Sequence, residues 1–376
     1  MANITGTRSG LRAYASEEFI PKFVTNQYTR SQLLSSIVSQ EGSDRELRPP
    51  GSGLIKGTMM GGSKAMHAKK MSVKGSESAS WGIQTGTSGG VKNLTARDTT
   101  ATIATPTTNS QDQKKVMTTV RWSKKQVQCV IWNSTASVNR GEWAIMSAVD
   151  DALGIAMQDL FDDLIEELWT GAPADQTAEF WSQQSGIDAI NSTTTTLYGI
   201  DRSVNDYFDG HRVTDSKTPA LALIDDANTV QEIDAKSGPV TLALFNPTDW
   251  LVVKAEALAK GGGGIIIREG TPEAARYGVS REAVLYGDTL MTKDYGLKDW
   301  SAVTTGAPNM ADNVFMAVIA DYVFETMTDY NFKVDEFIDV GRYTPGGIDA
   351  RSSHITLQYR FFTWHPKSSV LYTDVD

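Results

Sequence analysis

Residues 142–170 decide the fold, and their sequence is EWAIMSAVDDALGIAMQDLFDDLIEELWT. Apolar residues recur here at intervals of three and four, which is the spacing of one helix face. They are Met146, Val149, Leu153, Met157, Leu160, Leu164 and Leu168. Asn139 or Gly141 can cap the start, and Gly171 followed by Pro173 ends the pattern. The sequence therefore predicts one helix of about 29 residues, on the order of 44 Å long, which is long for a globular domain.

The predicted helix carries acids along its length and neither lysine nor arginine. The acids are Glu142, Asp150, Asp151, Asp159, Asp162, Asp163, Glu166 and Glu167. Carboxylates one turn apart repel each other by a few tenths of a kcal/mol, and the helix has no cation to offset this. Two interpretations stay open. Either the acids form an ordinary solvated face, or a basic element of another chain docks on them.

Charge is divided between the two parts of the chain. Up to Arg140 there are 19 Lys/Arg and 8 Asp/Glu, a net of +11, whereas from Gly141 onward 16 Lys/Arg face 37 Asp/Glu, a net of −21. This division indicates either nucleic-acid binding or pairing of the two parts. The basic residues are scattered among Ser, Thr and Gly, without the concentrated patch or interleaved aromatics of a nucleic-acid surface. We therefore favour pairing, within one chain or between chains.

The basic part begins with an arm and continues into a polar extension. Residues 1–50 contain a helical turn at Ser16–Ile20 and a helix at Ser31–Gln40, and Pro49-Pro50 ends the arm. Gly, Ser and Thr supply 28 of residues 51–112. Such a stretch is either a disordered linker or an extended β-arm whose partner lies elsewhere. Its threonine-rich part favours the β-arm.

The rest of the sequence predicts strands and an α/β region. Residues 114–132 have strand periodicity with a change of register, which indicates a bend. Between residues 172 and 312 short helices alternate with strands, as in an α/β layer. The clearest later elements are a strand at Val240–Phe245, a cap at Asn246–Asp249, a helix at Trp250–Ala259, a tip at Gly261, Gly262, Gly263 and Gly264, strands at Ile265–Ile267 and Val314–Ala320, and a half-buried strand at Ile355–Phe361.

Catalytic and metal-binding patterns are weak. The histidines lack metal-ligand spacing, and they are His67, His211, His354 and His365. The single cysteine, Cys129, excludes a disulfide framework and lies in a predicted strand, which indicates a core residue. Gly57–Lys64 reverses the Lys-Ser order of a phosphate loop, and Gly261–Gly264 lacks dinucleotide-site spacing. We therefore expect no catalytic residue, metal, cofactor or enzymatic activity.

Membrane insertion is not expected either. No apolar run reaches the roughly 18–20 residues of a membrane span, and the start lacks the apolar stretch of a signal peptide. We expect a soluble protein that is made inside the cell.

Three phrases and the order of the predicted elements resemble a known family. The phrases are Gly186–Ile190 followed by Tyr198–Ser203 and Tyr207-Phe208, Asn246–Trp250 before a helix, and Trp364–Val370 near the end. The elements run from an arm through a lysine-bearing extension, a long acidic helix and an α/β middle to terminal strands. In this order the chain resembles the HK97-fold major capsid proteins of tailed double-stranded DNA bacteriophages. The resemblance implies an α+β, HK97-like capsid fold.

The resemblance also implies five segments. They are an N-terminal arm (1–50), an extended β-hairpin E-loop (51–115), P-domain strands with the spine helix (116–175), an α/β A-domain (176–312) and P-domain C-terminal strands (313–376). The A-domain tip, here Gly261–Gly264, would gather at the centre of hexamers and pentamers. Some 110 residues of arm and E-loop would then add little to the subunit's own core.

The resemblance gives the acidic helix a partner, because in this family the E-loop lies over the P-domain of a neighbouring subunit. The lysines of one subunit would therefore pair with the helix acids of the next. The lysines are Lys56, Lys64, Lys69, Lys70 and Lys74, and the acids are Asp150, Asp151, Asp159, Asp162, Asp163, Glu166 and Glu167. Covalent cross-linking is not predicted, since no partner asparagine or activating acid can be matched.

The implied function is structural. The subunit would self-assemble as hexamers and pentamers into an icosahedral shell enclosing double-stranded DNA, in a virion assembled in the bacterial host cytoplasm. The implied partners are further copies of the chain, a separate scaffolding protein, a portal, a decoration protein and, non-specifically, the packaged DNA. Two alternatives stay open. One is an encapsulin-like nanocompartment shell, and the other is a metal-dependent α/β enzyme that uses the helix carboxylates.

Overall fold

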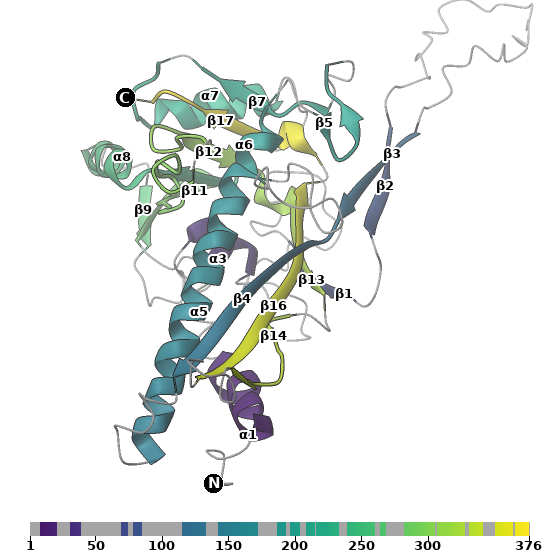
Figure 1. Ribbon diagram of the computed structural model, residues 1–376. Helices are drawn as coiled ribbons and strands as arrows, with labels where there is room; N and C mark the ends of the chain where they lie inside the picture. The colour runs from purple at the N-terminus through teal and green to yellow at the C-terminus, as the bar shows by residue number, and fades with distance from the viewer. Residues whose placement is uncertain are drawn as a thin grey trace, which may run out of the picture.

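In the computed structural model of the protein, one long helix shares a core with two large β-sheets (Figure 1). The structure describes residues 8–20, 31–38, 69–73, 78–84, 115–132, 142–171, 186–192, 196–203, 208–214, 216–232, 239–259, 264–267, 282–304, 307–327, 331–340, 350–363 and 365–375. Helix α5 spans Glu142–Thr170, as the sequence predicts. Its predicted apolar residues from Val149 to Leu168 are buried in the main core. The boundaries of the five implied segments stay predictions.

A six-stranded sheet lies beside α5 (Figure 1). Its central strand is β16 (Ala350–Thr363), which pairs antiparallel with β4 (Ser123–Trp132) on one side and with β13 (Tyr322–Met327) on the other. The shorter members are β1 (Lys69–Val73), β14 (Lys333–Val334) and β15 (Ile338–Val340). Residues far apart in sequence therefore share one core with α5.

A seven-stranded sheet forms the second layer, in the order β7-β17-β12-β8-β11-β10-β9. Its strands are β7 (His211–Val213), β8 (Leu242–Phe245), β9 (Gly264–Ile267), β10 (Ala283–Tyr286), β11 (Thr289–Lys293), β12 (Val314–Ala317) and β17 (Ser369–Tyr372). Helices α7 (Ala222–Val230) and α8 (Pro247–Ala259) pack on one face through a second apolar cluster. The other face contributes to the core that holds α5, which confirms the predicted α/β layer.

The sequence predicts a bend after Lys124-Lys125, and the structure places the break between two strands slightly earlier, at Trp122. Strand β3 (Lys115–Arg121) pairs with β2 (Ser78–Gln84), whereas β4, which follows it directly, pairs with β16. The chain thus changes partners at one buried residue, and the β2–β3 hairpin projects from the body (Figure 1). The change of register in the sequence reflects this change of partner.

The described parts of the N-terminal arm correct one expectation. The arm contains α1 (Arg8–Ala13), the π-helix η1 (Tyr14–Phe19) and α3 (Gln32–Val38). Its apolar side chains are buried in the main core of the same subunit, and they are Leu11, Ala15, Ile20, Leu33 and Leu34. The expectation that the arm adds little to this core is therefore wrong for these residues, because short helices gain their stability by packing.

Two strand predictions also need correction. Strand β16 is buried on both faces from Ile355 to Thr363, not on one. Its polar residue Arg360 pairs with Glu325, and its guanidinium lies 4.4 Å from the ring centroid of Trp122, so its charge is matched inside the protein. The strand predicted to reach Ala320 ends at Ala317 and is followed by a 3₁₀ turn, η5 (Ile319–Asp321).

Candidate functional site

The acids of α5 divide into an exposed strip and inward-facing members. Asp151, Asp159, Asp162 and Asp163 are exposed. Asp150 and Glu166 are half-buried, and Glu167 is buried. The exposed acidic surface of α5 is therefore smaller than the sequence predicts, because three of these acids are half-buried or buried.

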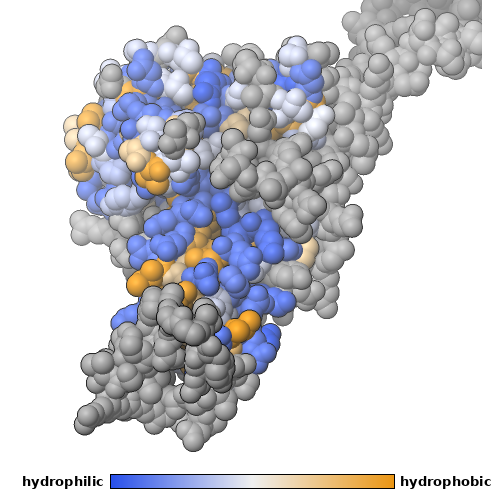
Figure 2. Space-filling model, in the orientation of Figure 1, coloured by the Kyte–Doolittle hydropathy of each residue, from blue (hydrophilic) through white to orange (hydrophobic). Residues whose placement is uncertain are grey.

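An exposed isoleucine interrupts this strip. Ile155 is 65% exposed, and it lies one helical turn from both Asp151 and Asp159. Figure 2 shows hydrophilic surface over the middle of the molecule, with hydrophobic residues set within it. Covering this side chain with another apolar surface would be favourable, because fully burying an isoleucine contributes about 1.5–3 kcal/mol. We call Asp151, Ile155, Asp159 and Asp162 the spine strip.

Glu167 has its cation within the same subunit. The Lys125 ammonium lies 3.0 Å from the Glu167 carboxylate, and the Ser123 hydroxyl donates to the same carboxylate at 3.2 Å. Burial and the Glu167 charge together raise the pKa of the nearby Tyr359 phenol, so the phenol keeps its proton. The prediction that Glu167 faces a neighbouring chain is corrected by this geometry, because β4 already covers it.

Asp150 is held by the N-terminal arm. The Tyr14 hydroxyl donates to its carboxylate at 2.6 Å, and Arg12 donates to the carbonyl of Val334 at 3.1 Å. The arm therefore bridges α5 and β14. Asp150 accepts its hydrogen bond from an uncharged group of its own chain.

The predicted basic partners are placed only in part. Lys69 and Lys70 lie in β1, where their Cα partners are Val323 and Phe324 of the chain's own sheet. This differs from the expected place in a projecting hairpin. The other predicted lysines, Lys56, Lys64 and Lys74, lie outside the described residues, as do Gly261, Gly262 and Gly263 of the predicted tip. Gly264 begins β9.

A buried carboxylate that the sequence did not reveal joins the arm to the end of β11. Asp294 is fully buried. Its carboxylate accepts hydrogen bonds from the Ser31 hydroxyl at 2.8 Å, the Leu33 N–H at 2.6 Å and the Gly296 N–H at 2.6 Å. Burial raises the pKa of Asp294, although these donors oppose the rise. The carboxylate thus fixes the start of α3 on the second sheet.

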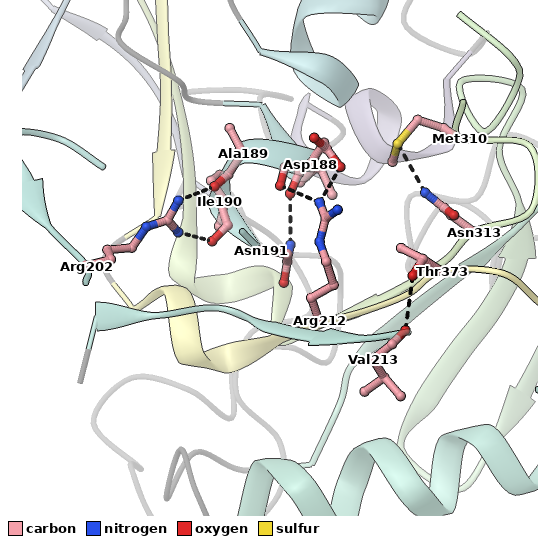
Figure 3. Close-up of polar contacts among 11 residues, drawn as sticks. Asp188, Ala189, Ile190, Asn191, Arg202, Arg212, Val213, Met310, Asn313 and Thr373 are labelled. Carbon is pink, nitrogen blue, oxygen red and sulfur yellow. Dashed lines mark hydrogen bonds and ion pairs between the residues drawn. The ribbon is translucent and has the colours of Figure 1, made fainter. Parts of the chain in front are cut away.

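Two arginines fasten the short helix α6 (Ile187–Ile190), which follows α5 (Figure 3). Arg202 is buried and donates to the carbonyls of Ile190 at 2.7 Å and Ala189 at 2.6 Å. Arg212, on β7, pairs with the Asp188 carboxylate and donates to its carbonyl at 2.9 Å. These contacts satisfy carbonyls at the end of the helix, and the Ala189 carbonyl also accepts the Ser192 N–H at 3.3 Å. The sequence phrase Tyr198–Ser203 contains Arg202, but its spacing gave no sign of this contact.

The groups considered for chemistry have structural surroundings. Burial raises the pKa of the Cys129 thiol to about 12, so the thiolate is scarce at neutral pH. Within the described ranges, no three side chains of His, Cys, Asp or Glu are grouped as metal ligands would be. His67 lies outside those ranges. Among the helices that the structure describes, none has both the length and the apolar character to span a membrane.

Comparisons with known proteins give a likeness of fold. No protein-family model matches the sequence, and no curated protein matches it. The chain is similar in structure to the capsid subunit of cyanophage A-1(L), with a TM-score of 0.53 and 11% identity over 81% of this chain and 90% of that chain.

Two further solved structures are similar at lower scores. For the SrpI encapsulin of Synechococcus elongatus, the TM-score is 0.48 and the identity 9%, over 82% of this chain and 85% of that chain. For the capsid of cyanophage P-SCSP1u the values are 0.44 and 11%, over 83% and 86%. Of these three structures, only the cyanophage A-1(L) subunit has a TM-score above 0.5, so only that likeness carries weight. At 11% identity it concerns the fold alone.

Proposed function

Because the chain has the HK97-like capsid fold that its sequence predicts, we propose that it is the major structural subunit of a virus shell. In this proposal the subunit self-assembles as hexamers and pentamers into an icosahedral shell that encloses double-stranded DNA. The observation that carries the proposal is the likeness to the cyanophage A-1(L) capsid subunit, which extends over 90% of that chain. The match also covers 81% of this chain, which supports a shared architecture over most of the subunit.

The spine strip supplies the surface for one contact between subunits. Its three carboxylates and exposed isoleucine suit a segment that carries both cations and apolar groups. The basic first part of the chain has that character, with a net charge of +11 up to Arg140. We therefore assign the strip to the lysine-bearing extension of a neighbouring subunit, with Lys56, Lys64 and Lys74 as the candidate cations.

The remaining parts of the proposal follow from a shell. The chain acts by assembly and not as an enzyme, and it uses no cofactor. Its partners are copies of itself, a scaffolding protein, a portal and a decoration protein, with non-specific contacts to the DNA. The subunits assemble in the bacterial host cytoplasm and end in the virion. The net charge of −10 suits DNA driven in by a motor better than DNA captured by basic arms.

The content of purified particles tests this function. Particles from the native source are treated with nuclease, disrupted, and analysed for protected nucleic acid and for enclosed protein. The proposal predicts protected double-stranded DNA. Particles that contain an enzyme cargo and no DNA would support the encapsulin-like alternative instead. A small oligomer whose catalytic turnover is abolished by chelators would support the metal-dependent enzyme.

A further inference from the structure

Helix α8 has two apolar faces, and only one is covered by its own subunit. Trp250, Val253 and Ala257 face the seven-stranded sheet and are buried. On the opposite side Leu251 is 63% exposed and Leu258 is 53% exposed. The other members of this face are Thr248, Val252, Ala255 and Ala259, which are also exposed. Figure 2 shows the hydrophobic patch at the left margin of the upper layer, where Figure 1 places α8.

The charged residues in the middle of α8 are held at the flanks of this face. Lys254 forms an ion pair with Glu282 at 2.6 Å. Glu256 accepts the N–H of Leu221 at 2.8 Å. Both side chains are half-buried, so partners within the subunit draw them away from the outward face. A solvated helix face normally carries several polar side chains, whereas Thr248 is the one polar member of this face among the described residues.

The last described strand of the seven-stranded sheet follows the helix. The chain passes from the end of α8 at Ala259 to β9 at Gly264, and β9 is the last strand in the order of its sheet. Among the described strands it pairs with β10 alone. Its sequence, Gly-Ile-Ile-Ile, has neither the charge nor the proline that commonly protects an edge. An apolar helix face and the last described strand of the sheet therefore lie close along the chain, on the same flank of the molecule (Figure 1).

Charge indicates which partner fits this flank. The chain has a net charge of −10, so two copies repel each other wherever exposed acids meet. The outward face of α8 has no charged member, and apposing it to another copy brings no such repulsion. A partner recognised mainly through ion pairs would find no counter-charge here.

We infer that the outward face of α8, with the adjoining edge at β9, is a contact surface for a second copy of this chain. The inference rests on the proposed function, because a shell requires contacts between copies, and it names the surface that makes one of them. It is separate from the spine strip, which lies on α5. Its energy comes from apolar burial, so this contact is less sensitive to salt than the spine strip.

Sedimentation velocity over a range of concentrations tests the inference. The variant Leu251→Glu/Leu258→Glu changes two exposed side chains and is expected to keep the far-ultraviolet circular dichroism and melting behaviour of the natural chain. The expected result is a self-association at least tenfold weaker. The matched control is Val303→Glu/Ile338→Glu, since these side chains are 66% and 61% exposed on other elements. The control should assemble like the natural chain.

Three outcomes would overturn the inference. They are unchanged self-association of the folded Leu251→Glu/Leu258→Glu variant, equal loss in the control, and a natural chain that stays monomeric. Failure of this inference and failure of the proposed function can be told apart. Shells that form equally well in the variant refute only the α8 contact. If the natural chain forms small oligomers and no shells, and the variant is monomeric, only the shell proposal is refuted.

A photo-crosslinking residue at position 258 identifies the occupant directly in cells that express the protein. Cross-links to another copy of the chain support the inference. Cross-links to a different protein, or a surface that reacts with nothing, contradict it. This readout does not depend on whether the glutamate variant folds.

Discussion

The ammonium group of Lys125 lies 3.0 Å from the carboxylate of Glu167, and both side chains are withdrawn from solvent. The pair joins β4 to the last turns of α5, so it ties the six-stranded sheet to the long helix. Asp163 lies 4.0 Å from the same ammonium but is 67% exposed. One lysine therefore faces a buried and an exposed carboxylate, which makes a direct comparison possible.

Glu167→Gln is expected to lower the free energy of unfolding by about 3 kcal/mol, because removing one partner of a buried pair leaves the other charge uncompensated. Asp163→Asn, the matched control, should cost less than about 1 kcal/mol, since exposed pairs contribute little. Urea unfolding monitored by tryptophan fluorescence measures both values. Equal costs for the two variants would show that the Glu167 pair is as well solvated as the exposed one.

The buried Asp294 predicts a specific pH dependence. Its pKa is raised in the folded protein by burial, above an unfolded value of about 3.9. As the pH rises from about 4 through the folded pKa, the unfolded chain releases its proton first, so stability falls. The difference in unfolding free energy between the natural chain and Asp294→Asn should therefore shrink as the pH rises. A difference that stays constant or grows would contradict this sign.

Cys129 should be chemically silent in the folded protein. Burial raises the pKa of its thiol to about 12, and the side chain is nearly inaccessible. A disulfide reagent at pH 8 should therefore label it only as the chain unfolds, and the labelling rate should rise steeply with urea. Rapid and complete labelling of the folded chain would show that the β4–β16 region opens readily.

Neutralising the spine strip should impair assembly without unfolding the subunit. The variant Asp151→Asn/Asp159→Asn removes two exposed charges from α5, and relief of like-charge repulsion should leave the helix as stable or slightly more stable. The yield of assembled particles in gradient sedimentation should fall several-fold. The control Asp225→Asn/Asp288→Asn makes the same change in net charge at exposed sites elsewhere. Equal yields for both variants would refute the role of the strip.

Local periodicity predicted the elements that local interactions determine. The bounds of α5 follow from an apolar stripe with clear end signals, and Asn246 caps α8 by accepting the Thr248 N–H at 2.8 Å, as expected. The bend near Trp122 was visible as a change in alternation. In each case the deciding residues are neighbours along the chain.

Local periodicity could not predict contacts between segments that are far apart in the sequence. Glu167 has the same spacing as the exposed acids of α5, and only β4 shows that it is buried. Asp294 meets Ser31 across 263 positions, and neither residue lies in a motif. Alternation along β16 indicated one buried face, because a sequence cannot show that Glu325 and Trp122 cover Arg360 on the other.

Electron cryo-microscopy of the purified, assembled protein tests the shell proposal most directly. The account predicts closed icosahedral particles, built from hexamers and pentamers, in which each spine strip is covered by a segment of the neighbouring subunit. A folded preparation that contains only monomers and small oligomers, at concentrations where capsid subunits assemble, would contradict it.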